Sequence, residues 1–227
     1  MDASLADTLV KLMAAWLLLF GAALWAWKEK LDLGKRMLTA SLRGLVQLLA
    51  LAFVLHWVFD IEAFWAQALL IAGFCIMAAR TSASHHPEPS HAWAAASVGL
   101  AAGCLVTLPW LAISGTLAAD SRTLIPLGSM VAANGMNAVS LMYHRIGGES
   151  ANAGEGLRTA MIPAVDTLRV AGLVHMPGIF VGMVLAGATA LAAASAQLIV
   201  LYMIVASNFT ACIVSFLMLN HLRKSRA

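Results

Sequence analysis

Long apolar runs separated by short polar links dominate the chain. Seven runs come close to the length of about 20 residues that a helix needs to cross a bilayer, and they cover 8–27, 37–59, 63–79, 92–114, 123–144, 161–187 and 196–219. The brief links leave no room for a separate extramembrane domain. The pattern therefore predicts an all-α polytopic membrane protein, in which residues 1–227 form one bundle of seven transmembrane helices.

Composition narrows the choice of environment and partner. Of the 227 residues, 61% are hydrophobic and 11% are charged, which is more apolar surface than a soluble domain can bury. The basic residues lie in short clusters between apolar runs, so we expect a lipid bilayer and no nucleic acid as partner. Three cysteines fall within apolar runs without Cys-x-x-Cys spacing, and we expect them to be buried free thiols: Cys75, Cys104 and Cys212.

The distribution of lysine and arginine predicts how the chain is oriented. Ten basic residues fall in the links 28–36, 80–91 and 145–160 and in the C-terminal tail, whereas the opposite set of links holds only Arg122. Basic residues accumulate on the cytoplasmic side of membrane proteins. We therefore expect the N-terminus outside, the C-terminus in the cytoplasm and a multi-pass protein of the cell (inner) membrane.

Small-residue pairs predict where helices approach closely. Gly99 and Gly103 are four apart in the fourth run, and Gly178 and Gly182 are four apart in the sixth. Glycines at this spacing allow two helix backbones to come together in a membrane.

Polar side chains interrupt the fifth run, IPLGSMVAANGMNAVSL. Met130, Asn134, Asn137 and Leu141 fall on one helical stripe. An amide in hydrocarbon is costly unless it finds a partner. The stripe is either hydrogen-bonding glue between helices or one wall of a polar transport pathway.

The sixth run carries the most unusual residues of the chain. Asp166 and Arg169 are three apart, so we expect them to face each other and neutralise their charges. His175, Met176 and Pro177 follow about two turns later. A carbonyl freed by the proline, an imidazole and a thioether could hold a borderline or soft cation, although a buried histidine beside a packed methionine gives the same pattern.

Two further sets of polar residues lie closer to the cytoplasmic side. Arg43 and Gln47, four apart in the second run, either extend to the interface or gate the cytoplasmic mouth of a pathway. The link SHHPEPSH places three imidazoles and a carboxylate within seven residues, as a loose metal site or a solvated loop would: His85, His86, Glu88 and His91.

The second, fifth and sixth runs together resemble one family. SLRGLVQLLALAFVLHWVF, IPLGSMVAANGMNAVSL and IPAVDTLRVAGLVHMPGIFVGMVLAG resemble FetB-type permeases in the same order along the chain. The resemblance implies a single transmembrane permease domain, a homodimer and a cytoplasmic ABC ATPase subunit. It also implies iron as the transported ion, with no covalently bound cofactor. The chain has no phosphate-binding loop of its own, so we expect a transport subunit and not an enzyme.

The sequence departs from the family pattern at three places. The segment 144–160 is short and Gly-rich where the family has a long charged segment, Asp166 and Arg169 replace neutral residues, and His175 replaces a serine. These differences leave three hypotheses open. The protein exports iron with an ATPase, it transports or conducts without one, or it is a membrane scaffold that transports nothing.

Overall fold

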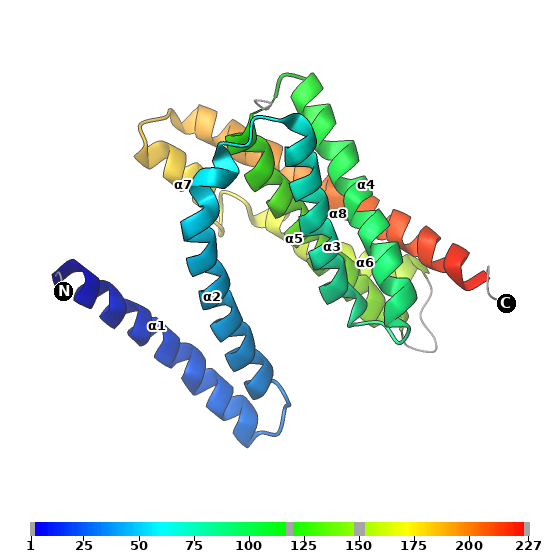
Figure 1. Ribbon diagram of the computed structural model, residues 1–227, viewed down its shortest axis with the longest axis horizontal. Coiled ribbons are helices and arrows are strands. Elements are labelled where there is room, and N and C mark those ends of the chain that lie inside the picture. Colours follow the sequence, from blue (N-terminus) through cyan, green and yellow to red (C-terminus); the bar gives the residue numbers. More distant parts are fainter. Residues whose placement is uncertain (1–2, 117–119, 148–152, 225–227) are drawn as a thin grey trace. The chain divides into compact units, whose positions relative to one another are not determined.

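A computed structural model describes residues 3–116, 120–147 and 153–224, and all eight elements in these ranges are helices (Figure 1). They form two compact units, residues 1–58 and 59–227. Six helices in the described ranges are long and apolar enough to cross a membrane. The prediction of an all-α multi-pass membrane protein is confirmed, and the count of seven crossings is not.

The first unit contains α1 (Ala3–Lys28) and α2 (Gly34–Phe59), whose last residue belongs to the second unit. Both helices are candidate membrane spans, and their side chains are mostly exposed, as expected for lipid-facing surfaces. Gly34 begins α2 where a Cβ would lie 2.6 Å from the carbonyl oxygen of Ala23, so the turn between the helices requires glycine.

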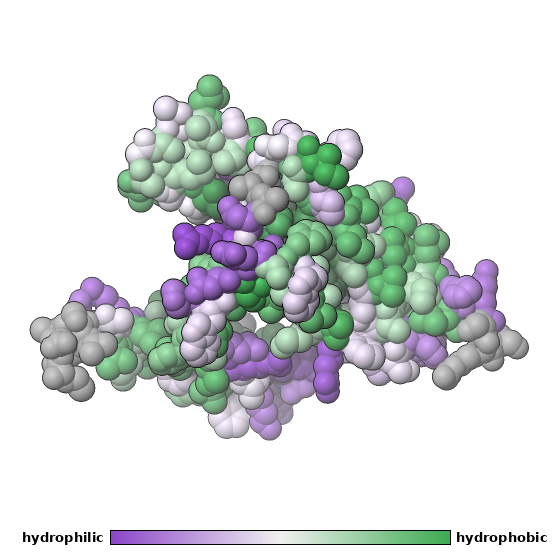
Figure 2. Space-filling view, turned by 45° about the horizontal axis from the view of Figure 1, so that its top comes forward, coloured by the Kyte–Doolittle hydropathy of each residue, from purple (hydrophilic) through white to green (hydrophobic). Residues whose placement is uncertain are grey.

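The second unit contains the six remaining helices. These are α3 (Phe64–Ala83), α4 (Pro89–Ile113), α5 (Ser121–Ile146), α6 (Ala153–Val170), α7 (Gly178–Leu185) and α8 (Ala190–Lys224). Helix α8 packs against α4, α5, α6 and α7, and α3 covers α4 and α5 (Figure 1). Hydrophobic residues make up much of the visible surface in Figure 2, which suits a protein with lipid as its solvent.

Helices α4 and α8 make the most extensive contact of the second unit. A Cβ on Gly99 would lie 2.5 Å from the carbonyl oxygen of Ala211, and one on Gly103 would lie 2.9 Å from that of Ser207. The close approach predicted for this pair is confirmed. No described atom outside the local helix lies within 4 Å of a Cβ on Gly178 or Gly182, so the second pair makes no such contact within the chain.

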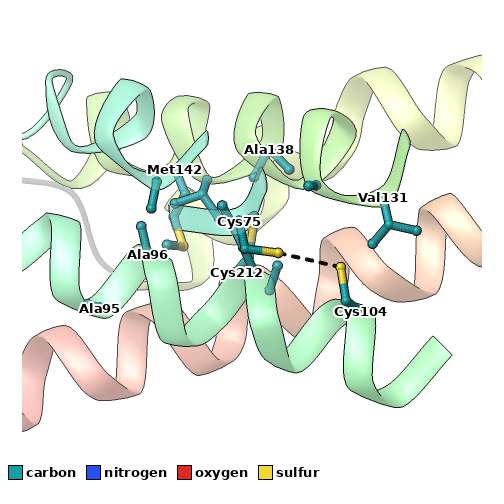
Figure 3. Close-up of a cluster of buried hydrophobic side chains, with 14 of the residues drawn as sticks. Cys75, Ala95, Ala96, Cys104, Val131, Ala138, Met142 and Cys212 are labelled. Atoms are coloured by element: carbon teal, nitrogen blue, oxygen red, sulfur yellow. Dashed lines mark hydrogen bonds between the residues drawn. The ribbon is translucent and has the colours of Figure 1, made fainter. Parts of the chain in front are cut away.

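A core of small and apolar side chains fills the space between α3, α4, α5 and α8. The three cysteines are free and buried here, as predicted. The Sγ atoms of Cys75 and Cys104 lie 3.6 Å apart, joining α3 to α4 (Figure 3). Next to them, a cavity of about 420 Å³ lies between α3 and α4, and Gln67 is the one amide in its otherwise mainly apolar lining.

The sixth predicted crossing, 161–187, is wrong as one continuous helix. The chain leaves α6 at Val170, turns, and resumes as α7 at Gly178. Gly172 adopts a φ of +82°, which an L-residue rarely takes, and its N–H donates to the carbonyl of His175 at 3.0 Å. Pro177 then disfavours helical geometry for the residue before it. Helix α6 therefore ends seven residues before Pro177, the proline that we expected to free a helix carbonyl.

The remaining helix ends extend beyond the apolar runs. Helix α8 has 35 residues and spans about 52 Å at 1.5 Å per residue, which exceeds a hydrocarbon thickness of about 30 Å. Helix α6 begins at Ala153, where a salt bridge of 2.8 Å between Arg145 and Glu155 joins it to the end of α5. Apolar run length did not predict the polar helical segments 153–160 and 220–224, nor the start of α8 at Ala190.

The contact between α4 and α8 predicts a specific sensitivity to one methyl group. Gly99→Ala places a Cβ against the backbone of α8, so the helices must separate, at a cost of about 1–3 kcal/mol. We expect a clear drop in melting temperature of the purified protein in detergent.

Gly182→Ala is the matched control, because its Cβ meets nothing within 4 Å. Alanine is the better helix former by about 0.5–1 kcal/mol, so this variant should melt at or slightly above the temperature of the native chain. Equal melting temperatures for the two variants would contradict the close packing of α4 on α8.

Candidate functional site

A small polar cavity lies between α5, α6 and α8. Its volume is about 120 Å³. The polar side chains on its walls are three amides and one hydroxyl, from Asn134, Asn137, Thr167 and Asn208. The rest of its lining is apolar: Ala138, Leu141, Ala160, Pro163, Ala164, Leu201 and Ile204.

Helix α5 supplies the two asparagines that the sequence singled out. Asn134 and Asn137 are three residues apart, so both reach the same side of the helix. The Nδ2 of Asn134 donates to the carbonyl oxygen of Met130 at 2.9 Å. A carbonyl oxygen can only accept, so this bond fixes the orientation of the amide and leaves Oδ1 as its other end. Met130 takes part through its backbone, and its thioether does not line the cavity.

Helix α8 supplies an amide that the sequence analysis missed. Asn208 is 4% exposed, and its Oδ1 has no hydrogen-bond partner among the described residues. A buried polar atom without a partner is rare and costly. The sequence does contain the relevant feature, because Asn208 lies in the apolar run LYMIVASNFTAC. An amide in such a run indicates a functional site by the same reasoning that we applied to α5.

Helix α6 completes the cavity with a proline and a threonine. The hydroxyl of Thr167 donates to the carbonyl oxygen of Pro163 at 2.8 Å. Pro163 has no N–H, so it cannot donate to the carbonyl of Thr159 as a normal helix residue would. Thr167 is therefore the polar side chain that α6 contributes to the cavity.

Asp166 and Arg169 lie outside this cavity. Their expected pairing is present, with Arg169 Nη1 lying 3.3 Å from Asp166 Oδ1. Both side chains are exposed on a face of α6 different from the one that carries Pro163 and Thr167. The ion pair neutralises two charges on the outer surface of the helix and does not contribute to the cavity.

The other predicted pathway residues do not belong to the lining of this cavity. His175 and Met176 lie exposed in the turn between α6 and α7. Arg43 and Gln47 are exposed on α2, in the first unit. Their proposed roles in a pathway stay predictions.

The histidine-rich turn between α3 and α4 forms a hydrogen-bonded cluster with the end of α8. His86 is buried, its Nδ1 accepts from the N–H of Glu88 at 3.0 Å, and its Nε2 lies 3.1 Å from Nη2 of Arg223. Arg223 also pairs with the carboxylate of Glu88, which in turn lies 3.3 Å from Nδ1 of His91. The ring of Tyr143 packs edge-on against His86.

This cluster joins helix ends instead of presenting a set of metal ligands. Within the described ranges, no three His, Cys, Asp or Glu side chains are grouped so that they could hold a metal ion. His85 is exposed and His86 is directed to Arg223, while only His91 and Glu88 of the predicted set touch through their side chains. The imidazole and carboxylate stabilise the junction of α3, α4 and α8.

The environment of the cluster shifts two pKa values. Burial lowers the pKa of His86, the Arg223 charge lowers it further, and contacts with Glu88 only partly offset both. Desolvation alone would raise the pKa of Glu88, but the charge and hydrogen bonds of Arg223 and a bond from His91 hold it below its ordinary value. The fold therefore favours neutral His86 and ionised Glu88.

The shifted histidine predicts acid sensitivity. As the pH falls through about 6.5, the ordinary pKa of histidine, the unfolded chain takes up a proton at His86 that the folded chain resists, so stability is lost until the lower folded-state pKa is reached. We expect the melting temperature in detergent to fall by a few degrees between about pH 7.5 and 5.5, and His86→Gln to reduce that fall. His85 is the exposed neighbour, so His85→Gln is the control and should keep the full fall in melting temperature. An unchanged pH dependence of the melting temperature in His86→Gln would contradict the assignment of this acid sensitivity to His86.

Comparison with known proteins gives the chain a family and several relatives. The "Uncharacterised protein family (UPF0014)" matches residues 9–157 and 150–222. The "Probable iron export permease protein FetB" of Escherichia coli (strain K12) is 27% identical over 231 residues, covering 90% of this chain and 89% of that protein.

Two further relatives come from other organisms. "UPF0014 membrane protein slr1647" of Synechocystis sp. is 28% identical over 222 residues, covering 85% of each chain. "UPF0014 membrane protein STAR2" of Oryza sativa subsp. japonica is 25% identical over 233 residues, covering 91% of this chain and 80% of the relative. No solved structure matches significantly. The chain belongs to the UPF0014 family of membrane proteins, as the FetB-type resemblance predicted.

Proposed function

We propose that this protein is a membrane permease that exports a transition-metal cation, iron, from the cytoplasm, powered by a separate ATPase subunit. The observation that carries the proposal is the polar cavity, because three amides and a hydroxyl converge there from helices α5, α6 and α8. Polar groups inside a membrane bundle are expensive and mark transport routes. The direction and the ion rest on the name of the relative FetB.

The bond of Asn134 favours a pathway over glue between helices. Glue requires an amide that bonds to a neighbouring helix. The amide N–H₂ of Asn134 instead donates to Met130, four residues earlier on α5. Asn208 has an amide oxygen without a partner, although α5 and α6 lie across the cavity from it. A scaffold would gain nothing from this unused polarity.

The break between α6 and α7 offers a means of opening and closing the route. Transporters commonly place their sites beside discontinuous helices, and alternating access comes from one part of the bundle moving against another. Helix α6 forms one wall of the cavity and ends at Val170, two residues before the left-handed Gly172. Movement of α6 about this turn would change access to Asn134, Asn137 and Asn208 without disturbing α4 against α8.

The outer residues would serve the same route in other states. Asp166 and Arg169 would act as a charged relay, and His175 and Met176 would contact the ion near the break. Arg43 and Gln47 would gate the cytoplasmic mouth. We further propose a homodimer in the inner membrane, with the N-terminus outside and the ATPase docked on the basic link 28–36 and the C-terminal tail.

A transporter without an ATPase is the second candidate. Helix α5 ends at Ile146 and α6 begins at Ala153, so the connection is short where FetB-type permeases carry the long charged segment expected to dock an ATPase. Residues 148–152 of that connection lie outside the described ranges. Either form of the proposal uses the same cavity.

Cellular metal content tests the proposal with a pair of matched variants. Asn208→Leu removes the unpartnered amide from the cavity, whereas Gln197→Leu removes another buried, unpartnered amide from α8 outside the cavity. After iron loading, cells with the native chain or with Gln197→Leu should hold less iron than cells without the protein. The Asn208→Leu variant should export iron at least about tenfold more slowly than the native chain, which corresponds to about 1.4 kcal/mol in the barrier.

Running the set with and without a candidate ATPase separates the two forms of the proposal. Export only with the ATPase supports the coupled permease, and equal export without it supports an autonomous transporter. Unchanged metal content in every strain, with all proteins present in the membrane at equal levels, would overturn the permease and favour the scaffold.

A further inference from the structure

The larger cavity of the second unit, between α3 and α4, favours an apolar occupant. It has a volume of about 420 Å³, and none of the described residues that line it is charged. Gln67 is the one amide in a lining otherwise made of apolar side chains and two thiols. A buried water needs about two to four polar partners, whereas apolar cavities of about 150 Å³ already bind benzene. The lining therefore suits hydrocarbon better than water or an ion.

The rim of this α3–α4 cavity lies on the outer surface of two candidate membrane spans. Phe64 on α3 and Leu105 and Ile113 on α4 line the cavity, and their exposed fractions are 73%, 71% and 85%. Both helices are long and apolar enough to cross a membrane. The exposed faces of such helices meet lipid chains and not water. The cavity therefore opens toward hydrocarbon.

The length of the α3–α4 cavity matches one leaflet of a bilayer. Its lining runs along α3 from Phe64 to Cys75 and along α4 from Ala101 to Ile113. At about 1.5 Å per residue, these stretches measure about 17 Å and about 18 Å, compared with about 15 Å for half of the hydrocarbon core. Phe64 is the first residue of α3, so the cavity begins at a helix end and extends to the middle of the span. A single acyl chain of one leaflet has this length and direction.

Cys75 and Cys104 mark the inner end of the cavity. Both residues line it, and their Sγ atoms lie 3.6 Å apart between α3 and α4 (Figure 3). Their exposed fractions are only 1% and 5%. Lipid that merely surrounds the protein does not reach such buried thiols, whereas an occupant that fills the cavity contacts them. The two thiols therefore distinguish a lipid chain inside the cavity from one on the surface.

We infer that the α3–α4 cavity holds one hydrocarbon chain of a bilayer lipid, which enters from the surrounding membrane and extends from Phe64 to the cysteine pair. Apolar groups gain little hydrophobic energy by leaving lipid, so the chain is held by the dispersion contacts that an empty cavity would forfeit. The chain also completes the packing of α3 on α4, where the protein's own side chains leave space. The inference goes beyond the proposed transport function and does not depend on it.

A phosphatidylcholine that carries a diazirine at the end of one acyl chain tests the inference. The full-length chain is reconstituted with this probe in phosphatidylcholine nanodiscs and illuminated, and the labelled residues are identified by mass spectrometry. We expect Cys75 or Cys104 to be labelled at least about tenfold more than Cys212, which is also buried but does not line the cavity. Equal background labelling of all three cysteines would overturn the inference and indicate that another helix or a second copy fills the cavity.

A second probe, with the diazirine beside the glycerol, tests the direction of the chain. This probe should label Phe64 or Ile113 at the outer end of the cavity and leave Cys75 and Cys104 unlabelled. Cysteine labelling that is equal for the two probes would show that no chain lies lengthwise in the cavity, and it would also overturn the inference.

Two substitutions on α4 connect the labelling to the cavity. Ala101→Phe adds a phenyl ring to the cavity wall, so the variant should show at least about tenfold less cysteine labelling by the chain-end probe. Val106→Phe introduces the same ring on the exposed surface of α4, outside the lining, and should leave the labelling unchanged. Undiminished labelling in Ala101→Phe, when both variants melt near the temperature of the native chain, would contradict the inference. If Ala101→Phe does not fold, the comparison of the three cysteines in the native chain decides by itself.

Discussion

The close contact of α4 with α8 is the constraint on which the second unit depends. In lipid, apolar side chains gain little by leaving their solvent for another helix, so association depends on tight packing and hydrogen bonds. Gly99 and Gly103 allow the two backbones to meet, and Tyr143 on α5 donates to the carbonyl of Ala92 on α4 while bonding to Ser215 on α8. Three helices are fixed by a few small and polar groups.

Fixing α8 in this way also positions the cavity. Ser207 and Ala211 meet the glycines of α4, whereas Asn208 and its neighbours Leu201 and Ile204 face α5 and α6. One helix therefore carries a tight structural contact and a polar wall within the same turns. The wall formed by α6 differs from the wall formed by α8, because α6 is interrupted at the break before Gly172. A firm α4–α8 contact beside an interrupted helix provides a fixed site with one movable side.

Local sequence rules predicted much of this arrangement. Apolar run length located six membrane helices, glycine spacing located the α4–α8 contact, and amides in hydrocarbon located Asn134 and Asn137. The rules failed where the outcome depends on neighbours in space. The side of α6 that faces the cavity, which excludes Asp166 and Arg169, is set by packing on α5 and α8. The break between α6 and α7 begins before Pro177 because Gly172 already adopts a left-handed backbone conformation. In the histidine-rich turn, His86 contacts Arg223, which is 137 residues away along the chain.

Water access to the cavity tests the central claim most directly. A cysteine reacts with a charged methanethiosulfonate only where water reaches it, and the three native cysteines are buried. Asn137→Cys, at the exposed edge of the cavity, is compared with Leu105→Cys on a lipid-exposed face of α4. A water-accessible route predicts modification of Asn137→Cys at least about tenfold faster than that of Leu105→Cys, since only the first thiol can ionise in water. Equally slow modification of both would contradict a polar pathway through α5, α6 and α8.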